Sequence, residues 1–112
     1  MKLIKAYVRT YKASKVVDVL EKLKIHRLMA IHVEEIGHGV FKEYEHFDSD
    51  MGTDYVEMIK IELVCPDGQA ETIKEAILES ARTEYQGDGV VVISPIEEAT
   101  SIRTGKSVLT NE

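Results

Sequence analysis

Two histidines lie among carboxylates in the middle of the chain. His38 and His46 share the stretch 37–54 with five acidic residues and one lysine, and imidazole and carboxylate groups together suit several divalent cations. Their spacing matches no compact ligand template such as His-Glu-x-x-His. The sequence therefore predicts no dedicated metal site. His38 and His46 remain the candidate ligands for the alternative in which one exists.

The same stretch combines aromatic residues with negative charge. It shows no apolar periodicity, and connections this long inside a compact domain are uncommon and usually functional. Aromatic side chains on an acidic arm favour insertion into a pocket of a partner. We expect a long mobile loop over 37–54 that contacts a partner protein through His38, Phe41, Tyr44, Phe47 and Asp48. The alternative is a solvated loop that folds back on its own domain.

Catalytic groups cannot be recognised from spacing. No Ser-His-Asp or Cys-His arrangement can be argued from the sequence. Arg9 follows the first predicted strand, as an acylphosphatase-type phosphate loop requires, but the asparagine that such a site also needs occurs only as Asn111 near the end of the chain. The sequence therefore predicts a protein that is not an enzyme.

Hydrophobic periodicity gives the element order β-α-β-β-α-β. Period-two alternation predicts strands over 3–9, 28–36 and 56–65, and a short apolar run between a Gly-Asp-Gly turn and Ser-Pro predicts a fourth over 90–93. Helical spacing predicts two helices, one capped by Ser14 and ending near Lys24, the other capped by Asp67 and ending near Ala81. One helical turn over 96–99 and a short extended piece over 101–105 follow. This order is typical of the α+β, ferredoxin-like fold, a four-stranded antiparallel sheet with both helices on one face.

The sheet face opposite the helices is expected to be apolar. The residues assigned to it are Tyr7, Ala30, Val56, Met58, Val64 and either Val90 and Val92 or Val91 and Ile93, beside the charged Lys5, Lys60 and Glu62. A contiguous apolar patch favours subunit association, whereas single exposed apolar residues are ordinary. The alternative is a merely mixed surface.

Length and charge bound the remaining possibilities. A chain of 112 residues predicts one domain over 1–112, with the loop 37–54 and a C-terminal tail at 106–112. A net charge of −6 without a basic cluster argues against nucleic acid as a partner. No apolar run is long enough to enter a membrane, and the N-terminus lacks a signal-peptide core. The single Cys65 suggests a reducing compartment, so a cytoplasmic location is expected.

Several motifs stand in one frame along the second half of the chain. They are Lys-Ile-Glu-Leu-Val-Cys-Pro-Asp at 60–67, Ala-Arg-Thr at 81–83, Gly-Asp-Gly at 87–89 and Ile-Arg-Thr-Gly at 102–105. In this order they resemble the PII signal-transduction family of nitrogen regulators, over almost the whole chain. The resemblance implies a homotrimer with three adenine-nucleotide clefts between subunits. It also implies a long loop that docks on a membrane transporter or metabolic enzyme.

The resemblance also implies roles for individual residues. Backbone groups near Glu62 and Val64 are expected beside the adenine, and Thr83 beside the nucleotide. The backbone of Gly87, Asp88 and Gly89 is expected to approach the ribose and phosphates. Arg103 would contact a phosphate, and Gly37 matches the entry of the loop. The nucleotide is an effector, and no obligatory cofactor is implied.

Departures from the family pattern narrow the expected ligands. Val90 and Ser101 replace two phosphate-facing cations, so ADP or AMP is expected to bind at least as well as ATP. Gly39 and Met58 replace the glutamine and lysine that hold 2-oxoglutarate, so sensing of that ligand is expected to be absent. The tyrosine sequence that receives covalent modification is also missing from the loop.

Two alternatives remain open at this point. One is a trimeric metal-tolerance protein of the CutA type, which shares the fold and needs no nucleotide. The other is a metal-responsive or bicarbonate-responsive branch of the PII-like proteins.

Overall fold

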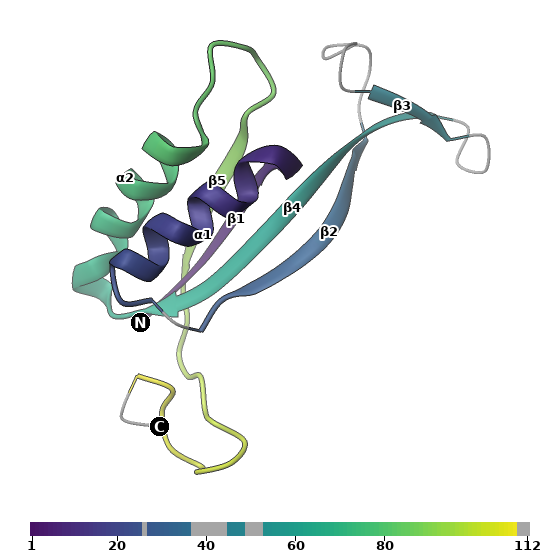
Figure 1. Ribbon diagram of the computed structural model, residues 1–112. Helices are drawn as coiled ribbons and strands as arrows, with labels where there is room; N and C mark the ends of the chain where they lie inside the picture. Colours follow the sequence, from purple (N-terminus) through teal and green to yellow (C-terminus); the bar gives the residue numbers. More distant parts are fainter. Residues whose placement is uncertain (26, 37–44, 49–52, 110–112) are drawn as a thin grey trace.

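The computed structural model describes residues 1–25, 27–36, 45–48 and 53–109 (Figure 1). Strands, two α-helices and two short 3₁₀ helices follow one another along these residues. In chain order they are β1 (Lys2–Arg9), the 3₁₀ helix η1 (Thr10–Lys12), α1 (Ala13–Lys22), β2 (Met29–Ile36), β3 (Glu45–Asp48), β4 (Thr53–Cys65), the 3₁₀ helix η3 (Asp67–Gln69), α2 (Ala70–Ala81) and β5 (Gly89–Pro95).

The sheet has the strand order β2-β4-β1-β5, and its neighbouring strands are antiparallel. α1 and α2 lie side by side over one face of it (Figure 1). This arrangement confirms the ferredoxin-like α+β fold that the sequence predicts.

Alternate residues of the two central strands fill the core between sheet and helices. Ile4 of β1 is fully buried opposite Leu63 of β4, and Ala6 is fully buried opposite Ile61. Each helix adds an apolar stripe, namely Val16 and Leu20 from α1 and Ile73 and Ile77 from α2. Full burial of a Leu or Ile side chain stabilises a fold by roughly 1.5–3 kcal/mol. The buried central strands β1 and β4 therefore hold the segments that follow their ends in fixed positions.

Neither helix begins with the side-chain cap that the sequence predicts. Lys12 occupies the N-cap position of α1, without a side-chain hydrogen bond, and Ser14 lies inside the first turn. Asp67 lies in η3, and its Oδ1 accepts a hydrogen bond from the amino group of Met1 at 2.5 Å, which lowers the pKa of the Asp67 carboxyl. In both places a 3₁₀ turn leads into the helix, and its carbonyls already bind the first helical N–H groups.

The predictions for the chain after β5 are wrong. Residues 96–99 form no helical turn, and 101–105 form a turn rather than an extended piece. An antiparallel bridge between Thr100 and Ser107 closes this turn. Inside it, the carbonyl of Ser101 accepts from the Gly105 N–H at 2.9 Å, and the Ser101 N–H donates to the Lys106 carbonyl at 2.8 Å. These local backbone bonds compete successfully with an extended conformation.

The connection predicted over 37–54 is not free of regular structure. Glu45–Asp48 form β3, and β4 begins at Thr53, three residues before the predicted Val56. β3 pairs antiparallel with the beginning of β4, Glu45 opposite Val56 and Asp48 opposite Thr53. This hairpin extends away from the two helices (Figure 1). A ladder of backbone hydrogen bonds without a helix over it leaves no apolar period for the sequence to display.

The strand register corrects one assignment on the sheet face opposite the helices, which we call the open face. Ala30 pairs with Ile61, a core residue, and so belongs to the helix side. Met29 and Ile31, the neighbours of Ala30 along β2, lie on the open face and are 53% and 43% exposed. The register also resolves β5: Val90 pairs with Tyr7, whereas Val91 and Ile93 pack against the core. The apolar side chains of the open face are Leu3, Tyr7, Met29, Ile31, Val33, Val56, Met58, Val64, Val90 and Val92.

Candidate functional site

The connection from α2 to β5 carries the residues 87–89, which we call the glycine segment. Gly87 and Gly89 have φ values of 92° and 110°, in the left-handed region that favours glycine. A Cβ on Gly89 would lie 1.7 Å from the backbone oxygen of Tyr7. Only glycine therefore lets β5 begin directly against β1, and this packing fixes where the glycine segment lies.

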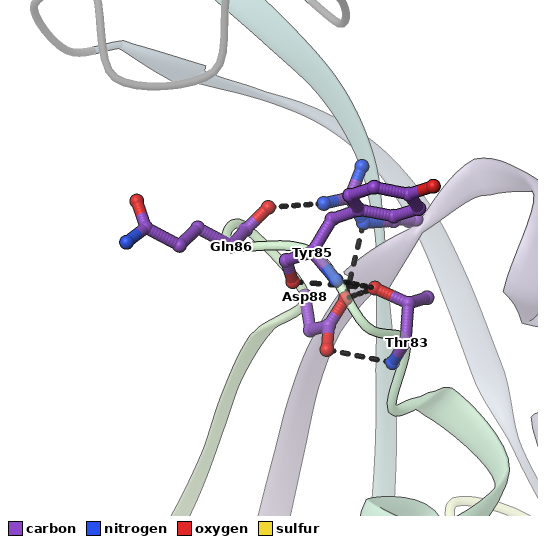
Figure 2. A network of polar contacts seen from close by, with 5 residues as sticks. Thr83, Tyr85, Gln86 and Asp88 are labelled. Carbon is purple, nitrogen blue, oxygen red and sulfur yellow. Dashed lines mark hydrogen bonds and ion pairs between the residues drawn. The ribbon is translucent and has the colours of Figure 1, made fainter.

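The carboxylate of Asp88 is turned back toward its own chain. Its Oδ2 accepts a hydrogen bond from the Thr83 N–H at 2.7 Å, and its Oδ1 accepts one from the Thr83 hydroxyl (Figure 2). The same hydroxyl oxygen accepts from the Tyr85 N–H at 3.1 Å. Asp88 and Thr83, both predicted to lie beside a nucleotide, thus meet in one network. Their side chains hold the connection together, and the backbone of the glycine segment remains the part able to approach a ligand.

A buried arginine completes this network. Nε of Arg9 donates to Oδ1 of Asp88 at 3.2 Å, and Nη2 of Arg9 donates to the Gln86 carbonyl. The Arg9 side chain is only 3% exposed. Burial alone raises the pKa of Asp88, but the hydrogen bonds from Thr83 and Arg9 and the charge of Arg9 outweigh it, and the pKa falls below its usual value. Asp88 is therefore ionised at neutral pH.

Sequence reasoning considered Arg9 only for a phosphate loop of the acylphosphatase type, and rejected that site. Alternation places Arg9 on the open face with Tyr7, where a charged residue would ordinarily be solvated. It is buried because residues 86–88 cover it, a contact between positions far apart in sequence. The sequence signal for Arg9 was a basic residue at the last position of a predicted strand. No local sequence pattern shows which residues bury its side chain.

A cavity of about 400 Å³ lies on the open face beside the glycine segment. Its lining combines apolar and acidic side chains with the glycine backbone. The lining residues are Tyr7, Val33, Glu34, Glu35, Met58, Gly87, Asp88, Gly89 and Val90. A cavity of this size is sufficient for part of a small ligand. Sequence analysis missed Glu34 and Glu35, because nothing in strand alternation indicates that both residues reach one hollow.

Two other predicted residues lie farther along the sheet. Glu62 and Val64 are on the open face of β4 and do not line this cavity. Glu62 forms an ion pair with Lys60 at 3.0 Å, and the hydrogen bond from that contact raises the pKa of Lys60. Within one chain, Glu62 and Val64 therefore lie outside the cavity beside the glycine segment.

The predicted phosphate ligand Arg103 lies at the opposite end of the molecule. β5 runs from Gly89 beside Val8 to Pro95 beside Lys2, a span of about 20 Å, and Arg103 follows it. Arg103 is exposed, and the adjacent Ile102 is fully exposed, on the turn that Ser101 anchors from its buried position. Within one chain, Arg103 and the glycine segment cannot contact the same small ligand.

The remaining predicted residues lie outside the described part of the chain. Gly37, His38, Phe41 and Tyr44 are not described, nor are the side chains of His46, Phe47 and Asp48, whose backbone belongs to β3. Within the described ranges, no group of three or more His, Cys, Asp and Glu side chains is arranged to hold a metal ion. No helix in those ranges is long and apolar enough to cross a membrane.

Comparisons with known proteins agree with the ferredoxin-like fold and show the family of the chain. The family model described as nitrogen regulatory protein P-II matches residues 1–106. The nitrogen regulatory protein P-II of Rhodobacter capsulatus is 34% identical over 107 residues, 96% of each chain, and that of Pyropia yezoensis is 34% identical over 104 residues, 93% of each chain. A crystal structure of Arabidopsis thaliana PII bound to citrate superposes with a TM-score of 0.74 at 26% identity, covering 94% of this chain and 85% of that one. These matches favour the resemblance to PII over the CutA-type alternative, and the chain belongs to the nitrogen regulatory protein P-II family, whose members are signal-transduction regulators.

Proposed function

We propose that this P-II family member binds an adenine nucleotide between copies of its chain and regulates a partner protein through residues 37–54. ADP or AMP is the expected effector, and ATP binds no more tightly. The observation that carries the proposal is the cavity beside the glycine segment, which opens on the same sheet face that the helices leave uncovered.

Assembly is supported by the character of the open face. Val90 and Val92 are 56% and 43% exposed there on the edge strand β5, and Met29 and Ile31 are exposed on the same face of the opposite edge strand β2. Exposed apolar residues on both edge strands, with half-buried Leu3, Tyr7 and Val64 on the strands between them, are typical of an interface. We infer a homotrimer in which the open faces meet, as the family implies.

A shared ligand site between copies is supported by the separation of its expected parts. The glycine segment stands at one end of β5 and Arg103 beyond the other. A second copy must supply Arg103, and with it Glu62 and Val64, if all of these residues are to contact one nucleotide. The exposed Ile102 beside Arg103 is consistent with a turn that packs on a neighbouring copy.

The preference for few phosphates is supported by the missing cations. Val90 lines the cavity where the family pattern has a lysine. Ser101 is 5% exposed inside its turn, so it offers no charge to a ligand. A hydrogen bond from a cation is worth roughly 1.5–3 kcal/mol, so two absences weaken polyphosphate binding by about two orders of magnitude or more.

A dicarboxylate effector is not supported. The Arabidopsis PII structure holds citrate. In this chain, however, Met58 lies in the cavity wall where the family pattern has a lysine, and Glu34 and Glu35 add negative charge beside it. We therefore propose that 2-oxoglutarate is not sensed.

Regulation follows if the nucleotide binds different arrangements of residues 37–54 with different affinity, because a ligand shifts only equilibria in which it discriminates. The proposed partner is a membrane transporter or a metabolic enzyme in the cytoplasm. A metal-responsive or bicarbonate-responsive role remains the alternative, and a metal and bicarbonate panel tests it alongside the nucleotides.

Calorimetry on the purified protein, with light scattering for its mass, tests this function. We expect a trimer that binds AMP or ADP, and a loss of about tenfold or more in affinity in Arg103→Ala with the trimer intact. Lys106→Ala removes a nearby exposed cation and is the matched control, with little expected effect. A monomeric protein, or one that binds no adenine nucleotide, would refute the proposal.

A further inference from the structure

The cavity beside the glycine segment is lined by carboxylates without a cation. Its lining includes the acidic residues Glu34, Glu35 and Asp88, and no Lys, Arg or His among the described residues lines it. Its other walls are apolar or glycine. A ligand group that enters this cavity therefore meets negative charge that the cavity itself does not neutralise.

The three carboxylates are not equivalent. Asp88 is paired with Arg9 and bound by Thr83, so its charge is compensated. Glu34 and Glu35 form no ion pair within the described ranges, and Glu34 stands directly opposite Glu57 in the register of β2 and β4. In the part of the chain that the structure describes, these two charges at the cavity therefore have no paired cation.

The register shows which of the two is better placed. Glu35 pairs with Val56 and alternates with Val33, so it belongs to the open face. The cavity lies on that face, beside the backbone of the glycine segment. Glu34 belongs to the opposite face and reaches the cavity from the side of the strand.

We propose that Glu35, assisted by Glu34, selects the effector by charge: the cavity favours AMP, binds ADP less tightly, and repels the additional phosphates of ATP most. This inference rests on the proposed nucleotide function and deepens it. The missing cations remove attraction toward all phosphates, whereas Glu35 adds repulsion that grows with each further phosphate.

The exposure of the Glu35 carboxylate determines how strongly it weakens the binding of ATP. Glu35 is exposed in the single chain, so its interaction with a phosphate is screened by water. For charges about 5 Å apart under such screening, Coulomb's law gives a change of roughly three- to tenfold in affinity. Raising the salt concentration must then reduce the penalty on ATP.

The experiment compares adenosine, AMP and ATP by calorimetry on the intact protein, in EDTA, at two salt concentrations. We expect AMP to bind about tenfold tighter than ATP, and Glu35→Gln to tighten ATP by about three- to tenfold while adenosine changes by less than about twofold. The matched control is Glu79→Gln, which removes the same charge from the exposed face of α2 and leaves the AMP-to-ATP ratio unchanged. A gain for ATP that shrinks at high salt supports charge selection.

Three results would overturn it. In the first, ATP binds tighter than AMP in EDTA, which leaves nucleotide binding but removes both the preference for few phosphates and charge selection. In the second, Glu35→Gln and Glu79→Gln change the AMP-to-ATP ratio equally, and the proposed function stands without charge selection. In the third, when the series is repeated with Mg²⁺ in place of EDTA, ATP becomes the tighter ligand and Glu35→Gln abolishes that gain, so the carboxylate holds a nucleotide-bound cation instead. Failure of all three adenine compounds to bind refutes the proposed function itself, and this inference with it.

Discussion

Arg9 and Asp88 form an ion pair between the end of β1 and the connection that precedes β5, with Nε and Oδ1 3.2 Å apart, although the two residues are 79 positions apart in sequence. The Arg9 side chain is 3% exposed and that of Asp88 26%. The pair therefore fastens the glycine segment to the sheet from its buried side.

Removal of the arginine is the first prediction. Arg9→Met leaves Asp88 ionised and without its cation, and breaking such a pair from one side costs about 2–4 kcal/mol. We expect a loss of this size in the free energy of unfolding, measured with urea. Arg9→Lys should recover only part of it, because an ammonium group cannot reproduce the two-directional contacts of a guanidinium with Asp88 and Gln86. Equal stability of Arg9→Met and the parent protein would contradict this assignment.

The second prediction concerns the stability of the fold at acidic pH. The pKa of Asp88 is lower in the folded protein than its unfolded value of about 3.9, so its contribution is fully present above about pH 4 and is lost as the pH falls through the folded pKa. Asp88→Asn should be less stable at neutral pH and should lose less stability than the parent below about pH 4. Urea titrations at several pH values measure this difference. Parallel acid profiles for the two proteins would show that Asp88 titrates normally.

The third prediction concerns the start of β5. Gly89→Ala places a methyl group 1.7 Å from the backbone oxygen of Tyr7 at a φ of 110°, so β5 must move away from β1. We expect severe destabilisation, seen as a large fall in Tm, and loss of nucleotide binding. Gly105→Ala is the control: its φ is 70°, but nothing lies within 4 Å of the added methyl. Its expected cost is about 1 kcal/mol of backbone strain. Similar costs at both positions would contradict the close approach to Tyr7.

The fourth prediction concerns the open face. Val92→Asp puts a carboxylate into the proposed interface, where burying an unpaired charge is expensive, so we expect dissociation into monomers by light scattering. Leu23→Asp is the matched control, since Leu23 is 37% exposed at the end of α1 rather than on the sheet. A trimer that tolerates Val92→Asp but not Leu23→Asp would place the interface elsewhere.

The fold was predictable because its strands and helices carry strong periods. The alternation of β1 and of residues 59–65 predicted which residues form the core, and the register confirms it. The same alternation predicted the wrong face for Ala30, because all but one of the described residues of β2 are exposed and neither face of this strand is marked by burial. The caps at Ser14 and Asp67 failed because 3₁₀ turns satisfied the helix ends first.

The candidate site was predictable only in part. Gly87 and Gly89 are visible in sequence, because a residue type that avoids steric clash marks a close backbone approach. The places of Arg9 in the Asp88 network and of Glu35 in the cavity lining are not visible, since both arise from contacts between distant segments. β3 left no signal either, because a short ladder outside the helix layer needs backbone hydrogen bonds and no apolar face.

β4 runs without interruption from its pairing with β3 to the cavity wall. Val56 is the last residue of β4 that pairs with β3, and Met58, two residues farther along, lines the cavity. That separation is about 7 Å along one strand. The base of the hairpin and the cavity wall therefore belong to one continuous strand, so a ligand in the cavity would lie against the same strand that carries β3.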